Sequence, residues 1–198
     1  MSLKSEAAGR VIAGILSGGG SRRFGSDKAC AVWGGKSLLE WTIHNASCIT
    51  DDINILTKTP EPYRFTGCSI IKDIRSISTP ISGILSIMPY VGDWLLLLAC
   101  DIPFFEKKVL EFLWERRDSE KATVIHVNGK YQPFLALYPR SVLHYWEDAF
   151  YHNEYHLQRV IESMPKTVIE ESDLMFAGIS LESFLNINTR ADLERIGI

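Results

Sequence analysis

The sequence predicts an α/β protein of three αβα layers, in which a mostly parallel, Rossmann-like sheet lies between two layers of helices. Two patterns predict this class. Apolar runs of strand length alternate along the chain with segments of helical periodicity. The run 93–99 is apolar after its first residue, as in strands buried on both faces of a parallel sheet. The length, 198 residues with 46 % hydrophobic, suits a single domain with a full core.

The elements follow in order from these runs. We expect strands at 11–16, 52–57, 68–71, 93–99, 122–127, 132–138 and 166–169. We expect helices at 37–46, 80–88, 105–117, 141–149, 156–163 and 191–196. Pro80 suits a first helical turn, Pro133 is tolerated near the start of a strand, and Thr189 is a suitable N-cap for the last helix. Ligands of such sheets bind beyond the carboxyl ends of the strands, so the residues after each strand are the site candidates.

Composition excludes several classes of protein. The net charge is −3, from 21 Lys and Arg against 24 Asp and Glu, whereas nucleic-acid and anionic-membrane binders need a concentrated positive field. No apolar run approaches the ~20 residues that a membrane helix needs. The four cysteines form no C-x-x-C pair, and the histidines have no metal-ligand spacing. We therefore expect a cytoplasmic protein with reduced thiols and without nucleic-acid or membrane partners.

A glycine-rich basic loop follows the first strand directly. It reads Leu16-Ser17-Gly18-Gly19-Gly20-Ser21-Arg22-Arg23-Phe24-Gly25-Ser26-Asp27-Lys28. Glycines let backbone N–H groups approach a phosphate, and the basic side chains add positive charge. The dinucleotide fingerprint would need glycine in place of Arg23, and the Walker pattern would need glycine in place of Cys30. The loop therefore predicts a phosphate-binding site of neither of these two types, with a flexible glycine turn carrying solvated basic residues as the alternative.

An acidic residue follows the most apolar strand. Asp101 begins the segment Asp-Ile-Pro-Phe at the carboxyl end of the run 93–99. Magnesium prefers oxygen ligands and commonly takes one or two carboxylates together with substrate phosphates. Asp101 is thus a candidate Mg²⁺ ligand facing the phosphate loop. The alternative is that Asp101 caps the helix expected to begin at Phe105.

The loop resembles the signature of the nucleotidyltransferases that make dinucleotide forms of the molybdenum cofactor. That pattern runs L-A-G-G-x-S-x-R-M-G-x-D-K, from which Ser17 and Phe24 are mild departures. The arginine, aspartate and lysine of the family fall on Arg23, Asp27 and Lys28. The segment around Asp101 resembles the metal site of the family, and together the resemblance extends over most of the chain.

The resemblance implies roles for particular residues. The implied nucleotide-binding residues are Leu16, Ser17, Gly18, Gly19, Lys28, Asp73 and Asp101. The implied catalytic residues are Arg23, Lys28 and Asp101, of which Asp101 is the metal ligand. The implied acceptor-binding residues are Gly83, Asn186 and Asn188. Each of these assignments has a structural alternative. Asp73 could be a surface turn residue, Gly83 could ease the start of the helix, and the two asparagines could form the entry to the last helix.

The activity implied by the resemblance is transfer of GMP from GTP to the terminal phosphate of molybdopterin, with release of pyrophosphate. Gly18 and Ile102 are typical of the guanylyl-transferring members, whereas Thr57 stands where the family often has an asparagine near guanine. The implied nucleotide-binding part is about 10–105 and the acceptor-binding part about 106–198. Proteins that deliver or receive the pterin are the implied transient partners. The alternatives are a CTP-dependent or sugar-phosphate nucleotidyltransferase of the same fold and a non-catalytic GTP-binding module.

Overall fold

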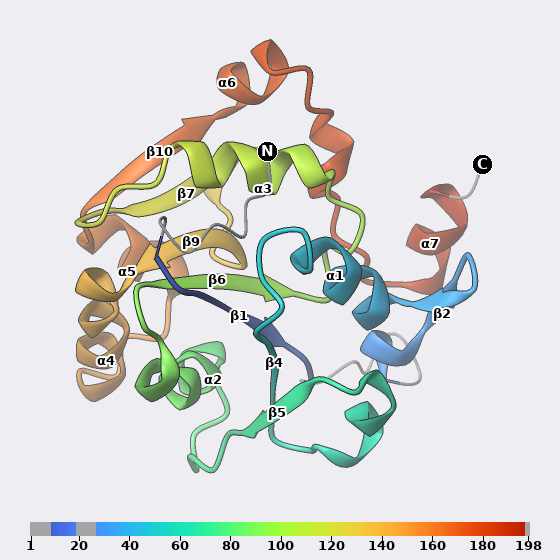
Figure 1. Cartoon of the computed structure of the whole chain (residues 1–198), viewed down its shortest axis with the longest axis horizontal. Coiled ribbons are helices and arrows are strands. Elements are labelled where there is room, and N and C mark those ends of the chain that lie inside the picture. Colours follow the sequence, from blue (N-terminus) through green and yellow to red (C-terminus); the bar gives the residue numbers. More distant parts are fainter. Residues whose placement is uncertain (1–8, 19–26, 197–198) are drawn as a thin grey trace.

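The computed structural model describes residues 9–18 and 27–196, and an eight-stranded sheet forms its centre (Figure 1). The strands are β1 (Val11–Leu16), β2 (Val32–Trp33), β3 (Lys36–Ser37), β4 (Ile53–Thr57), β5 (Ser69–Lys72), β6 (Trp94–Ala99), β7 (Ala122–Val127), β8 (Lys130–Tyr131), β9 (Leu135–Pro139) and β10 (Lys166–Glu170). The helices are α1 (Leu38–Ala46), α2 (Pro80–Ile87), α3 (Lys107–Glu115), α4 (His144–Tyr151), α5 (Leu157–Ser163), α6 (Glu171–Phe176) and α7 (Arg190–Ile196).

The main sheet has the strand order β10-β7-β9-β6-β1-β4-β5, and β8 pairs with β7. The pairs β1–β4, β1–β6, β4–β5 and β7–β10 are parallel. Only β9, between β6 and β7, and the short β8 pair antiparallel in this sheet. Strands β2 and β3 form a separate hairpin. The expectation of a mostly parallel sheet is confirmed.

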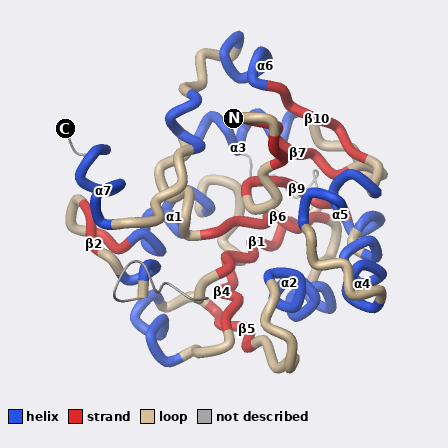
Figure 2. Tube along the Cα trace, turned by 180° about the vertical axis from the view of Figure 1, so that it is seen from behind, coloured by secondary structure: helices blue, strands red, loops and turns tan. Residues whose placement is uncertain are grey.

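Helices cover both faces of the sheet, as Figures 1 and 2 show from opposite sides. Apolar side chains of α1 and α3 pack on one face, and those of α2, α4 and α5 pack on the other. Every residue of β6 is buried, as its continuous apolar run predicts. Across the two described stretches, no helix has the length and hydropathy needed to cross a membrane.

Local signals explain where the helices next to the sheet begin. Ser37 and Glu40 form a capping box at the start of α1: the Ser37 Oγ accepts from the Glu40 N–H (3.2 Å), and the Glu40 Oε2 accepts from the Ser37 N–H (2.7 Å). Thr79 caps α2, and Pro80 occupies its first turn. These caps satisfy backbone N–H groups in the first turns of α1 and α2.

The structure differs from the expected elements in several places. The strand expected at 132–138 begins only at Leu135, because a turn precedes it in which the Leu135 N–H donates to the Gln132 carbonyl. The helix expected at 141–149 begins at His144, after a 3-10 turn over Arg140–Val142. The hairpin of β2 and β3, the strand β8 and the helix α6 were not expected. The strands β2, β3 and β8 and the helix α6 are all too short to give a periodic pattern of apolar residues.

Candidate active site

A cavity of about 830 Å³ lies at the carboxyl edge of the sheet. The chain passes outward from β1 to β4 and β5, then crosses to β6 on the other side of β1, and ligands bind at such reversals of strand order. The volume is within the ~300–1,000 Å³ of small-molecule sites. Residues at or just after the ends of β1, β4, β5 and β6 line it: Leu16, Ser17, Gly18, Leu56, Thr57, Lys58, Thr59, Asp73, Ala99, Cys100 and Asp101.

Ser17 and Gly18 carry the chain from β1 along the cavity wall. The Ser17 N–H donates to the Leu56 carbonyl (3.0 Å), which extends the pairing with β4. The Ser17 Oγ lies 3.0 Å from the Sγ of Cys100, so the ends of β1 and β6 are joined. Gly18 has a φ of +96°, and a Cβ there would lie 3.2 Å from the Thr57 Oγ1. Gly18 is therefore needed both for its backbone conformation and for its closeness to Thr57.

Two residues that the sequence assigns to the phosphate loop, Gly19 and Arg23, lie outside the described residues. The same holds for Gly20, Arg22 and Gly25. Their roles stay predictions from the sequence. The described parts of the loop are its two ends, Leu16 to Gly18 and Asp27 to Lys28, and all five of these residues line the cavity.

Lys28 lies at the start of a 3-10 turn whose position is fixed by Asp27. The Asp27 carboxylate accepts from the Ala29 N–H (3.1 Å) and from the Tyr63 hydroxyl (2.6 Å). The Lys28 Nζ donates to the Asn188 Oδ1 at 3.3 Å. Burial lowers the pKa of Lys28, while neighbouring acids, Asp101 foremost, act in the opposite direction. The cavity therefore holds a partly desolvated cation, which a bound anion would stabilise.

Asp101 follows β6 on the other side of the cavity. Its Oδ1 is buried and has no hydrogen-bond partner in the described part of the chain. The alternative role as a helix cap is wrong, because α3 begins at Lys107 and its N-cap is Glu106. An unpartnered buried carboxylate oxygen needs a ligand, and a divalent cation is a suitable one.

The described residues contain no cluster of three or more His, Cys, Asp or Glu side chains placed to hold a metal ion. A cation at Asp101 would therefore take its remaining ligands from substrate oxygens and water, which is the usual arrangement for Mg²⁺. The donor set thus fits a metal that binds together with a phosphate-bearing substrate. It does not fit a structural metal enclosed by protein ligands.

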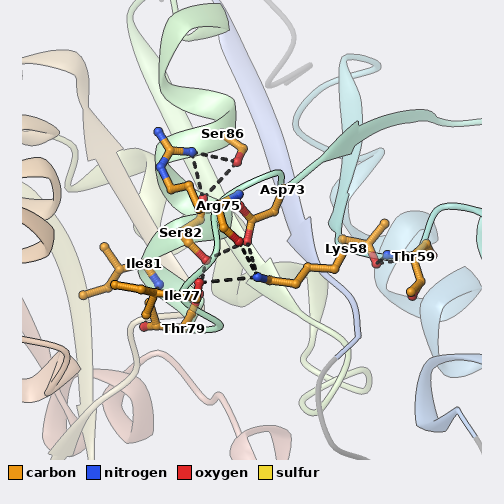
Figure 3. A network of polar contacts seen from close by, with 10 residues as sticks. Lys58, Thr59, Asp73, Arg75, Ile77, Thr79, Ile81, Ser82 and Ser86 are labelled. Atoms are coloured by element: carbon orange, nitrogen blue, oxygen red, sulfur yellow. Dashed lines mark hydrogen bonds and ion pairs between the residues drawn. The ribbon is translucent and has the colours of Figure 1, made fainter.

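Asp73 follows β5 and lines the cavity, and its carboxylate already has partners within the chain (Figure 3). The Oδ2 accepts from the Ser82 hydroxyl (2.6 Å) and lies 3.8 Å from the Lys58 Nζ, and the Oδ1 accepts from the Arg75 N–H (3.0 Å). Asp73 is 6 % exposed. It is therefore a fixed part of the cavity wall, where the resemblance predicts a nucleoside contact.

The three predicted acceptor-binding residues are placed differently. Gly83 lines the cavity, and a Cβ there would lie 2.5 Å from the Leu16 Cδ2, so this glycine allows α2 to pack closely on the end of β1. Asn188 also lines the cavity and holds Lys28. Asn186 is exposed and is not a lining residue. The structure thus brings two of the three to the cavity.

Sequence reasoning missed several cavity residues. Lys58 and Phe134 line the cavity, and Tyr63 fixes Asp27 beneath it. Lys58 directly follows the strand β4, so its position was a usable signal. Nothing local marks Phe134 or Tyr63, since each reaches the site through tertiary packing. The N–H of Ile187 donates to the Asp101 carbonyl (2.8 Å), a contact between distant segments that no local pattern predicts.

Comparison with known proteins adds a family and a fold. Residues 13–168 match the MobA-like NTP transferase domain. A probable molybdenum cofactor guanylyltransferase from Bacillus licheniformis is 30 % identical over 189 residues, which cover 92 % of this chain and 94 % of the relative. A molybdenum cofactor guanylyltransferase from Syntrophotalea carbinolica is 28 % identical over 184 residues, covering 91 % and 88 %.

Solved structures share the fold. A molybdopterin-guanine dinucleotide biosynthesis protein A from Archaeoglobus fulgidus superposes with a TM-score of 0.77 at 24 % identity, covering 94 % of this chain and 96 % of the other. A 2-C-methyl-D-erythritol 4-phosphate cytidylyltransferase from Thermus thermophilus superposes with a TM-score of 0.67 at 14 % identity, covering 91 % and 94 %. Both likenesses concern the fold alone.

Proposed function

The chain belongs to the MobA-like NTP transferase family, and from this membership we propose that it is a guanylyltransferase that joins GMP, from GTP, to the terminal phosphate of molybdopterin. Pyrophosphate is the second product. The relatives that match over nine-tenths of the chain carry this activity in their names. The fold is that of a nucleotidyltransferase, with the cavity at the carboxyl edge of the sheet.

One observation supports this proposal most directly. Lys28 and Asp101 come from the ends of different segments and face the same cavity, where the charge of Asp101 opposes the lowering of the Lys28 pKa by burial. A cation and a buried carboxylate oxygen without a hydrogen-bond partner among the described residues line one cavity, and this combination suits a triphosphate carrying a metal ion. A purely apolar ligand would form no favourable electrostatic interaction with either Lys28 or Asp101.

Nucleotidyltransferases in general use a divalent metal, and we propose that here it is Mg²⁺ held by Asp101. When bound there, the ion neutralises negative charge on the phosphates. The protein would contribute one carboxylate oxygen, the Asp101 Oδ1, which is buried and has no hydrogen-bond partner among the described residues.

The residues of the chain act by positioning and by charge. The Lys28 ammonium offsets negative charge on the α-phosphate and the leaving pyrophosphate, and the phosphate cradle starts at Gly18, since the Ser17 N–H is already bonded to the Leu56 carbonyl. An oxygen of the acceptor phosphate forms a bond to the α-phosphorus, while the bond from that phosphorus to the bridging oxygen of pyrophosphate breaks. The acceptor phosphate is already ionised, so no side chain has to remove a proton.

The proposal divides the chain into a nucleotide-binding part at about 10–105 and an acceptor-binding part at about 106–198. Most of the cavity wall comes from the first part, and Phe134 and Asn188 come from the second. The acceptor would approach from the side of Phe134 and Asn188. Proteins that deliver or receive the pterin stay predicted partners, and the cytoplasm stays the predicted location.

The test is a thermal-shift panel with GTP, CTP, ATP and UTP, each with and without Mg²⁺, followed by a pyrophosphate-release assay with molybdopterin. A nucleotide at 100 times its Kd adds about 2.7 kcal/mol to the free energy of unfolding. We expect the largest shift with GTP, an increase of this shift with Mg²⁺, and release of pyrophosphate only with the acceptor. A CTP preference would transfer the assignment to a cytidylyltransferase, and GTP binding without turnover would favour a non-catalytic module.

A further inference from the structure

Lys58 joins three parts of the loop between β5 and α2 (Figure 3). Its Nζ donates to the Arg75 carbonyl (2.7 Å) and to the Ile77 carbonyl (3.4 Å), and it lies 3.8 Å from the Asp73 Oδ2. The ammonium therefore makes two hydrogen bonds to loop carbonyls and one ion pair to the Asp73 carboxylate. Lys58 thus ties the loop to the end of β4.

The loop depends on polar contacts because its own apolar side chains do not anchor it. Ile74 is 84 % exposed and Ile77 is 40 % exposed. Apart from Lys58, the second anchor is Arg75, whose guanidinium donates to the Ser86 Oγ (3.1 Å) and to the Ser82 carbonyl (3.4 Å) on α2. A loop with few buried apolar contacts has a low free energy of local opening, so hydrogen bonds and ion pairs of this kind are what keep it ordered.

The same loop forms one wall of the cavity. Asp73, Ser78 and Thr79 line the cavity together with Lys58, while Lys28 lines the wall formed by the phosphate loop. The Lys58 side chain is 37 % exposed. Its ammonium donates to the loop carbonyls of Arg75 and Ile77 and is thus engaged by the loop rather than free for a phosphate.

We propose that Lys58 is a positioning residue that preforms the wall from Asp73 to Thr79 for the nucleoside half of the substrate. This inference rests on the proposed nucleotidyltransferase function, in which that wall receives the nucleoside. A wall that is ordered before binding lowers the conformational entropy lost when the nucleoside enters. Lys58 acts on nucleoside affinity through the loop and does not touch the reacting phosphates.

The test compares Lys58→Met with Lys72→Met. Lys72 ends β5, is exposed, and has no side-chain hydrogen bond or ion pair to the described residues, so its substitution removes the same charge near the same loop. The first measurement is amide hydrogen exchange of residues 74–79 in the protein without nucleotide. We expect faster exchange there in Lys58→Met and unchanged exchange in Lys72→Met, with both variants folded.

The second measurement is affinity for GTP, guanosine and inorganic pyrophosphate. In Lys58→Met we expect the Kd of GTP and of guanosine to rise about tenfold, the Kd of pyrophosphate to stay unchanged, and the KM of GTP to rise while kcat stays within about twofold. Weaker pyrophosphate binding with unchanged exchange would make Lys58 a direct phosphate ligand and overturn the inference. Wild-type exchange and guanosine affinity in Lys58→Met would overturn it as well.

These readouts separate the inference from the proposed function. If the wild-type protein binds no GTP, the proposed function fails, and the exchange of residues 74–79 still decides whether Lys58 holds the loop. If the wild-type protein binds GTP and Lys58→Met behaves like Lys72→Met in every measurement, only the inference fails.

Discussion

Replacing Lys28 by methionine separates what this residue does for the fold from what it does for the reaction. Methionine keeps the unbranched apolar stem and removes the charge. In the ligand-free protein, burial is the main influence on the Lys28 pKa and lowers it, so the charged form is disfavoured by folding. Losing the hydrogen bond to Asn188 costs little, because Asn188 is exposed and water can replace the donor.

The expected magnitudes follow from this environment. The free energy of unfolding of Lys28→Met should be at most about 1 kcal/mol lower than that of wild type, or it should be higher. For a chain of this size, such a decrease would lower the Tm by roughly 2–4 °C. Removing a preorganised charge contact to the reacting phosphates costs about 2.7–4 kcal/mol of transition-state stabilisation. We therefore expect kcat to fall by about 10²–10³ while the fold stays intact.

The pH dependence provides a further check with a definite sign. The Lys28 pKa is lower in the folded chain than the ordinary value of 10.5, so the unfolded chain binds more protons between the two values. The unfavourable contribution of this lysine is fully present below the folded pKa and is relieved as the pH rises through it toward 10.5. Any stability advantage of Lys28→Met over wild type should therefore shrink in that window.

The assay combines pyrophosphate release with thermal unfolding, and Lys130→Met, an exposed lysine on β8, is the control for loss of one positive charge. A kcat of Lys28→Met within threefold of wild type would remove Lys28 from the mechanism. A Tm more than about 8 °C below that of the control would refute the argument from burial, because the fold would then depend on the ammonium.

Three further substitutions and treatments test other parts of the site. Asp101→Asn should abolish the increase that Mg²⁺ adds to the GTP-induced thermal shift, and an unchanged increase would place the metal ligand elsewhere. Tyr63→Phe removes the 2.6 Å hydrogen bond to Asp27 and should lower the free energy of unfolding by about 1–2 kcal/mol, measured by urea denaturation; an unchanged midpoint would mean that water replaces the hydroxyl. Burial raises the pKa of Cys100 to about 12. In the native protein its alkylation should therefore be slower than that of Cys48 at pH 8 and should accelerate with rising pH. Peptide mapping would measure both rates, and equal labelling of the two thiols would contradict this expectation.

The fold was predictable from local patterns, and the confirmed αβα class rests on them. The strands β1 and β7 have the expected bounds, because long apolar runs with clear breaks leave little freedom. The direction of β9 was not predictable, since an apolar run has the same appearance in a parallel and an antiparallel strand. Hairpins of two-residue strands such as β2 and β3 give no periodic signal at all.

The candidate site was predictable where its residues follow strands. Lys28, Asp73 and Asp101 lie in segments after β1, β5 and β6, and the structure brings all three to one cavity. The partners of these residues were not predictable. Lys28 donates a hydrogen bond to Asn188, and Tyr63 donates one to Asp27. Both bonds depend on how segments distant in the sequence pack together, which the local sequence around each residue does not indicate.

The contact of Lys28 with Asn188 joins positions 160 residues apart. Contacts of such large sequence separation close long loops, and the entropy of that closure must be offset by the packing around them. The cavity is therefore complete only when the segment around Asn188 lies against the end of the phosphate loop. The stability that GTP adds would then report on the joining of the two ends of the chain, and a chain lacking the segment after Asp101 would gain less from the nucleotide.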